Sequence, residues 1–188
     1  NEDWLKRDLE PLAEDSLLGA WNGAYFRAMR KAIVAGDEDA VCQPHCSERS
    51  RAESEPSPEE GFEITGRSEV FVVNRLRQMQ EMMSGAVHLR SRPTRLSFGP
   101  TGRCNHRCAM CHNLDDRRRG VLPELGEPFY RQVQELLPTL ADLAVSGPGE
   151  PFVSRAFRAF VEGIDHRHYP DLGLTITTNG ATLTARQL

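Results

Sequence analysis

The chain has 188 residues, of which 39% are hydrophobic and 27% charged, an ordinary composition for a soluble globular protein. Its formal net charge of −4 argues against a strong general attraction to nucleic acid or to an anionic membrane, and no apolar run is long enough to span a bilayer. The 5 cysteines are odd in number and clustered, which excludes a simple disulfide framework and suits reduced thiols that bind a metal or cluster.

The N-terminus lacks the basic-then-apolar order of a signal peptide, so we expect a cytoplasmic protein. The chain starts with Asn1 and stops at Leu188, just where a new helical pattern begins. We therefore expect it to be part of a longer polypeptide.

A helix is predicted to follow Asn22-Gly23, with Phe26, Met29 and Ile33 on one face and Gly36 as its C-terminal cap. We assign residues 1–50 to a helical segment that also carries the cysteine pair Cys42 and Cys46. Residues 51–68 are polar, charged and interrupted by proline, which is typical of a flexible linker.

A second helix is expected after Ser68, ending at Gly85. The apolar stripe of this helix consists of Val72, Leu76, Met79 and Met83. We expect Met79 and Met83 to lie in the core.

From about residue 94 the pattern changes to alternating strands and helices. Strands are predicted at 95–98 and 140–145 and around Leu172, Leu174 and Ile176. Helices are predicted from Pro128 to Pro138 and over 152–164. This order predicts an α/β fold with parallel strands. We assign residues 69–188 to this part of the chain.

A distinctive loop follows each predicted strand. The first carries three cysteines in Cys104-Asn-His-Arg-Cys108-Ala-Met-Cys111, the second reads Ser146-Gly-Pro-Gly-Glu-Pro151, and the third is Thr177-Thr-Asn-Gly180. The carboxyl ends of parallel strands lie at one rim of the sheet, where ligands bind, so we expect the three loops to converge there. Three thiolates hold three irons of a cubane cluster and leave the fourth iron open to a ligand.

These motifs resemble the radical S-adenosylmethionine (radical SAM) enzymes over roughly residues 92–188. The family signature C-x3-C-x2-C is matched by Cys104, Cys108 and Cys111, and its Gly-Gly-Glu-like motif by Gly147-Pro-Gly149-Glu150. A Thr-Asn-Gly turn after the third strand is matched by Thr178-Asn179-Gly180. The resemblance implies a partial (β/α) radical SAM barrel with about three strands.

The resemblance also implies a mechanism. The three cysteines would bind a [4Fe-4S] cluster whose open iron chelates S-adenosylmethionine, and reductive cleavage would give a 5′-deoxyadenosyl radical that abstracts hydrogen from an unknown substrate. Gly147 and Gly149 would let the backbone approach the methionine portion, and Glu150 would pair with its ammonium group. Thr178 or Asn179 would hydrogen-bond the ribose or the carboxylate. The implied partners include an electron donor such as flavodoxin or ferredoxin.

Two residues depart from the family pattern. Met110 stands where the family usually has an aromatic residue near the adenine, and Met is a softer filler. Pro148 offsets the second glycine, so the loop reads Gly-Pro-Gly-Glu. Both departures blur which group touches the cofactor.

Other interpretations of the same motifs stay open. The cysteines suit a zinc-binding structural module with His106 or His112 as fourth ligand, or an iron–sulfur electron-transfer module. Taken alone, Gly149-Glu150 is a turn followed by a solvated carboxylate at a helix start, and the Thr-Asn-Gly sequence is a common turn.

Cys42 and Cys46, with Trp21-Asn-Gly23 upstream, resemble the tail of a SPASM-type extension. Such extensions carry auxiliary iron–sulfur clusters in peptide- and protein-modifying radical enzymes, which would make the substrate a peptide. In the family the extension follows the barrel, whereas here it precedes it, and two free thiols or half a zinc site explain the pair equally well.

Two charged stretches have simpler explanations. Asp115-Asp-Arg-Arg-Arg119 is expected to be a solvated loop, with docking of an acidic substrate or reductant as the alternative. His166 and His168 are expected at the surface, opposite the active rim. We also expect residues 1–188 alone to bind a cluster poorly and to turn over slowly, because an open barrel edge would expose apolar surface.

Overall fold

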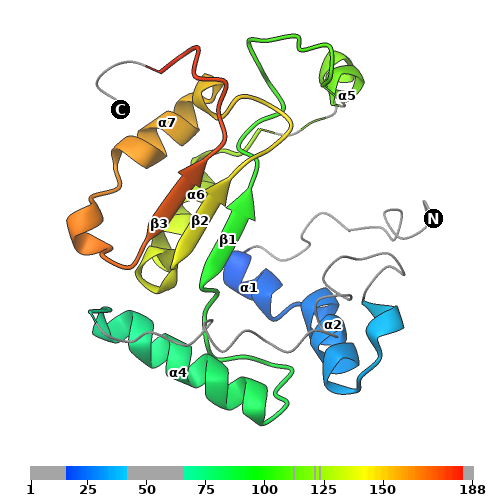
Figure 1. The fold of residues 1–188 in the computed structure, drawn as a ribbon, viewed down its shortest axis with the longest axis vertical. Coiled ribbons are helices and arrows are strands. Elements are labelled where there is room, and N and C mark those ends of the chain that lie inside the picture. The colour runs from blue at the N-terminus through cyan, green and yellow to red at the C-terminus, as the bar shows by residue number, and fades with distance from the viewer. Residues whose placement is uncertain (1–15, 42–65, 112, 121, 123, 184–188) are drawn as a thin grey trace. The chain divides into compact units, whose positions relative to one another are not determined.

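The computed structural model describes residues 16–41, 66–111, 113–120, 122 and 124–183 (Figure 1). The chain divides into two compact units, residues 1–92 and 93–188. The predicted linker lies almost wholly outside the described residues, as do Cys42 and Cys46.

The first unit is helical. It contains α1 (Leu17–Trp21), α2 (Ala24–Val34), a 3₁₀ helix (Glu38–Ala40) and α4 (Glu69–Met83). Ser16 and Ser68 begin α1 and α4, because each hydroxyl accepts a hydrogen bond from a backbone N–H of the first turn. Gly36 has a positive φ of 71° after α2, which confirms the predicted glycine cap.

The face of α4 that contacts the chain after it is largely polar. The Asn74 amide donates to the Arg92 carbonyl at 3.0 Å and accepts from the Arg92 N–H at 2.8 Å. One and two turns further along, Gln78 donates to the same carbonyl at 2.8 Å, and Glu81 accepts the Ser91 hydroxyl. Side chains at this spacing share one helix face, so hydrogen bonds position α4 against the segment that ends the unit.

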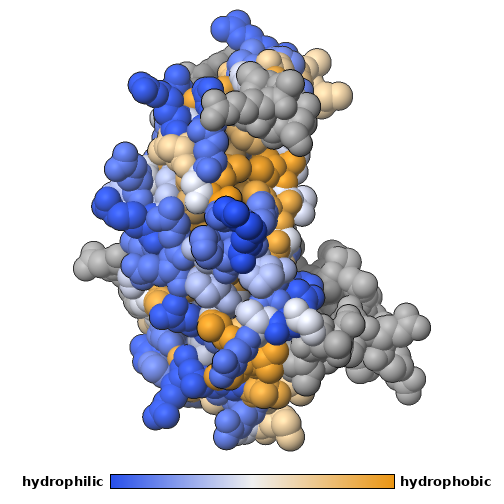
Figure 2. Space-filling model, turned by 90° about the vertical axis from the view of Figure 1, so that its left-hand side faces the viewer, coloured by the Kyte–Doolittle hydropathy of each residue, from blue (hydrophilic) through white to orange (hydrophobic). Residues whose placement is uncertain are grey.

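This arrangement overturns the predicted apolar stripes in part, since Val72 and Met79 of α4 are half-buried but other members of the stripes are exposed. Leu76 is 50% exposed and Met83 is 84% exposed, while Phe71 and Asn74 are the buried residues of α4. Ile33 of α2, expected on an inner face, is 60% exposed. The prediction failed because periodicity identifies an apolar face but not a face that is buried through hydrogen bonds. Figure 2 shows hydrophobic patches on a face of the molecule that is otherwise largely hydrophilic.

The second unit contains a parallel sheet with three strands among the described residues, in the order β1 (Arg95–Phe98), β2 (Asp142–Val145) and β3 (Gly173–Ile176). Phe98 pairs in register with Val145, which pairs with Ile176, so the strands end level with one another (Figure 1). The α/β fold class is confirmed, and the barrel stays a prediction.

The helices of this unit are α5 (Leu114–Arg119), α6 (Glu127–Leu136) and α7 (Arg155–Glu162). Short 3₁₀ helices lie at Leu137–Thr139, Pro151–Val153 and His166–His168. Pro128 stands in the first turn of α6, as predicted. The helix predicted over 152–164 is split, because Ser154 caps α7 and directs the preceding residues into a 3₁₀ turn.

Aromatic rings connect the helices to the sheet. Phe98 of β1 packs edge-on against Phe129 with ring centroids 5.0 Å apart. Tyr130 stacks on Phe160 of α7 at 5.0 Å, and Phe157 is fully buried beside both. This layer holds the strands whose ends carry the predicted site.

The predicted loop over 115–119 is wrong, because these residues belong to α5. Asp115 and Asp116 occupy the first turn, and Arg119 in the last turn forms an ion pair with Asp116. Acidic residues at the start and a basic residue at the end complement the helix dipole, which explains a helix in so polar a stretch.

Burial of Tyr130 predicts a pH effect on stability. The side chain is 3% exposed, and this burial raises its pKa to about 12. The neutral phenol is favoured in the folded state, so its contribution is complete below the unfolded pKa of about 10 and is lost as pH rises through 12. We expect Tyr130→Phe to remove this loss, measured as the free energy of urea unfolding between pH 9 and roughly 12.

Tyr25→Phe, which changes a tyrosine that is 49% exposed, is the control and should follow the unmodified chain. If Tyr130→Phe loses as much stability at alkaline pH as the unmodified chain, burial of this phenol is not the cause.

Candidate functional site

The candidate site lies where the three parallel strands end. The cysteine loop follows Phe98, the Gly-Pro-Gly-Glu loop follows Val145, and the Thr-Asn-Gly turn follows Ile176. These three exits lie at the same end of the sheet (Figure 1). The prediction that the motifs share one rim is therefore confirmed.

The first two loops touch through their backbones. A Cβ atom on Gly147 would lie 2.6 Å from Cα of Gly99, and one on Gly149 would clash with the carbonyl oxygens of Thr101 and Arg103. The backbone N–H of Glu150 donates to the Arg103 carbonyl at 2.8 Å. Both glycines are thus required for the Gly-Pro-Gly-Glu loop to lie against the start of the cysteine loop.

Glu150 is almost completely buried, with 1% of its surface exposed. Its Oε1 accepts the Thr178 hydroxyl at 2.6 Å and the Phe152 N–H at 3.2 Å, and its Oε2 accepts the Asn179 N–H at 2.7 Å. A buried carboxylate is costly unless hydrogen bonds satisfy it, and three donors do so here. This carboxylate joins the loop after β2 to the turn after β3.

The turn after β3 also reaches the cysteine loop. Asn179 Nδ2 donates to Asn105 Oδ1 at 2.8 Å and to Cys104 Sγ at 3.8 Å. Its Oδ1 accepts the Ala181 N–H at 2.9 Å. Asn105 was not among the predicted site residues. The position of this residue directly after the first cysteine was the available signal. Through Asn179 all three loops form one hydrogen-bonded group.

The three predicted ligand cysteines lie on one loop, and none of them forms a disulfide. Cys104 and Cys111 are partly exposed and Cys108 is exposed. The backbone N–H of His106 donates to Cys104 Sγ at 3.3 Å. In the part of the chain that the structure describes, no three His, Cys, Asp or Glu side chains converge as a metal-ligand group. The donor set fits a thiolate-bound iron–sulfur cluster by its chemistry, since three soft cysteine ligands stand within one loop.

The remaining predicted residues lie around this group. Met110 is 87% exposed. The zinc alternative needs His106 or His112 as fourth ligand, and His112 lies outside the described residues.

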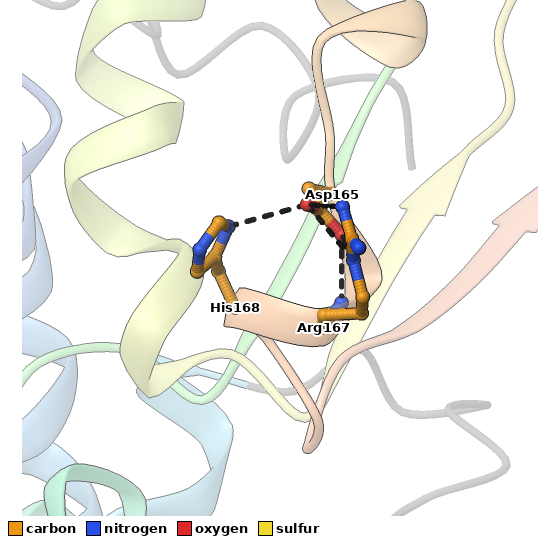
Figure 3. Close-up of polar contacts among 3 residues, drawn as sticks. All are labelled: Asp165, Arg167 and His168. Atoms are coloured by element: carbon orange, nitrogen blue, oxygen red, sulfur yellow. Dashed lines mark hydrogen bonds and ion pairs between the residues drawn. The ribbon is translucent and has the colours of Figure 1, made fainter.

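A second polar group lies between α7 and the start of β3, away from the strand ends that carry the motifs. Asp165 accepts from Arg167 Nη2 at 2.6 Å, and His168 Nδ1 lies 3.5 Å from the same carboxylate (Figure 3). Hydrogen bonds from Arg167 lower the pKa of Asp165. His166 and His168 are exposed, as predicted. This group stabilises the turn into β3 and does not belong to the candidate site.

Among the described residues, no helix is both long and apolar enough to cross a membrane.

The chain is similar to the FeMo cofactor biosynthesis protein NifB of Klebsiella pneumoniae, with 33% identity over 91 residues. The matched stretch covers 43% of this chain and 19% of NifB, so the chain corresponds to a minor part of that protein. No protein-family model and no solved structure matches the chain.

The contact between loops at Gly149 predicts an effect on stability. We expect Gly149→Ala to lower the free energy of unfolding by about 1–3 kcal/mol, because the added methyl group meets backbone atoms that cannot turn aside. Native-state hydrogen exchange of the β2 amides measures this within the second unit.

Gly126→Ala is the matched control, because its Cβ would lie 3.6 Å from Pro128, an ordinary contact, and its φ is −100°. Equal losses in the two variants would show that the loop contact at Gly149 has no special importance.

Proposed function

We propose that this chain is part of a radical SAM iron–sulfur enzyme and that β1–β3 are the first strands of its barrel. The observation that carries the proposal is the buried Glu150 carboxylate, which connects the Gly-Pro-Gly-Glu loop to the Thr-Asn-Gly turn beside Cys104. Three sequence motifs that are far apart in the chain thus form one polar group. Similarity to NifB, a protein named for FeMo cofactor biosynthesis, supports an iron–sulfur function.

Cys104, Cys108 and Cys111 would bind a [4Fe-4S] cluster, and no disulfide among the described residues competes for their thiols. Such a cluster, when bound, supplies the electron that cleaves S-adenosylmethionine to a 5′-deoxyadenosyl radical, which takes hydrogen from the substrate. The residues of the chain bind and orient the cofactor around it. For this role we propose Gly147, Gly149, Glu150, Thr178 and Asn179, with Met110 near the adenine.

The close loop contacts refine these proposed roles. The space beside Gly149 is filled by backbone of the cysteine loop, so this glycine would act by bringing the two loops together. Both oxygens of Glu150 already accept hydrogen bonds. Because the side chain is only 1% exposed, Glu150 would act on S-adenosylmethionine through Thr178 and Asn179, which it orients, and not by direct contact with the ammonium group.

The identities of the substrate and of the reductant are further proposals that depend on the enzyme function proposed above. A peptide substrate and an auxiliary cluster rest on the SPASM-like pair Cys42 and Cys46, and an electron donor such as flavodoxin or ferredoxin rests on the need for one-electron reduction. The name of NifB offers a different direction, the biosynthesis of a metal-containing cofactor. The alternatives to an enzyme are an iron–sulfur electron-transfer module and a zinc-binding structural module.

Anaerobic reconstitution with iron and sulfide distinguishes these alternatives. We expect a brown chain, with the cluster at low occupancy, whose reduced cluster changes its electron paramagnetic resonance spectrum when S-adenosylmethionine is added, because one iron lacks a protein ligand. A brown chain that does not respond would support the electron-transfer module. A colourless chain that retains zinc would support the zinc module.

Cys108→Ala should abolish this cluster and its response to S-adenosylmethionine, because two thiolates cannot hold three irons. Cys42→Ala is the matched control, and iron analysis together with the spectrum should show that the responsive cluster remains. A responsive cluster in Cys108→Ala would contradict the proposed ligand set.

A further inference from the structure

The side-chain amide of Asn179 has two hydrogens and two acceptors in reach. One acceptor is Asn105 Oδ1 at 2.8 Å, and the other is Cys104 Sγ at 3.8 Å, within the range of a hydrogen bond to sulfur. Asn179 is 75 residues away from Cys104 in sequence and follows a different strand. The first cysteine therefore receives a polar contact from outside its own loop.

The orientation of this amide is determined by its surroundings. Asn179 Oδ1 accepts the Ala181 N–H at 2.9 Å, so exchanging the oxygen and nitrogen would bring two donors together and two acceptors together. The NH₂ group must therefore face Cys104 and Asn105.

The backbone that carries Asn179 is held from inside the protein. Its N–H donates to Glu150 Oε2 at 2.7 Å, and the neighbouring Thr178 hydroxyl donates to Oε1 at 2.6 Å. Glu150 is 1% exposed, so these bonds to a charged acceptor are protected from water. An exposed hydrogen bond from an amide to sulfur must compete with water. The buried hydrogen bonds to Glu150 fix the backbone of Asn179 in advance, which reduces the entropy cost of forming the bond to sulfur.

We propose that Asn179 is a positioning residue that donates a hydrogen bond to the Cys104 ligand sulfur. The inference rests on the proposed function, and it assigns Asn179 a role toward the cluster ligand that is distinct from contact with the ribose or carboxylate. A donor at a ligand sulfur stabilises the more negative, reduced cluster and so raises its reduction potential.

The contact itself is testable in the metal-free chain. Nuclear magnetic resonance of the Asn179 side-chain NH₂ group should show an upfield shift of one amide proton in Cys104→Ala, because the sulfur acceptor is removed. Cys111→Ala is the matched control and should leave both protons unchanged. Equal shifts, or none, in the two variants would overturn the contact.

The effect on the cluster is tested by a redox titration followed by electron paramagnetic resonance, without S-adenosylmethionine, so that cofactor contacts play no part. Asn179→Leu keeps a side chain of similar size and removes the donor without adding a charge near the cluster. We expect at least a tenfold fall in the ratio of reduced to oxidised cluster at a given potential, a shift of about 59 mV to more negative values. Gln134→Leu removes an exposed amide from α6, outside the three loops, and should keep the potential of the unmodified chain.

The two tests separate the proposals from each other. A cluster whose potential is the same in Asn179→Leu as in the unmodified chain overturns the role of Asn179 and leaves the proposed function intact. An Asn179–Cys104 contact seen by nuclear magnetic resonance in a chain that takes up only zinc overturns the proposed function, and with it the role toward a cluster.

Discussion

A single buried carboxylate holds the candidate site together. Glu150 accepts three hydrogen bonds, one from its own loop and two from the turn after β3. Its burial would be strongly unfavourable without them, so the turn has one geometry in which the carboxylate is satisfied. The position of Asn179, and through it the contact with the cysteine loop, follows from this requirement.

Close approach of backbone to backbone provides the second constraint. Gly99 and Gly147 lie against each other, and Gly149 lies against the carbonyl groups of the cysteine loop. Absence of side chains at these points allows the loops after β1 and β2 to share hydrogen bonds, such as that from Glu150 to Arg103. Main-chain hydrogen bonds and glycine contacts thus hold the loops after β1 and β2 together, and the Glu150 carboxylate holds the loop after β2 to the turn after β3.

The strands and most helices of the second unit could be predicted from sequence because local signals define them. Pro128 begins α6, and the apolar strands alternate with the helices. The Ser154 cap that starts α7 was not predicted. The common rim followed from parallel topology. The burial of Glu150 could not be predicted, because a carboxylate after a glycine turn is ordinarily solvated and its donors lie 28 and 29 residues away in sequence.

Predictions for the first unit were weaker for a related physical reason. Apolar periodicity assigned Leu76 and Met83 to the inner face of α4, whereas Asn74 and Glu81 make the contacts. Packing through hydrogen bonds depends on which backbone groups a distant segment presents to the helix. The apolar pattern of the helix alone does not identify those groups. The polar stretch of α5 was mistaken for a loop because its charge order, rather than apolar residues, favours the helix.

The placement of Glu150 also has a consequence for how the protein folds. When only β1 and β2 have paired, the carboxylate lacks the two donors that β3 brings, and it must stay hydrated. Dehydration of this group and docking of the third strand are therefore expected to occur together, so that the rim closes in one cooperative step late in folding. A nascent chain would then expose its thiols without a preformed binding rim until residue 179 has joined the sheet.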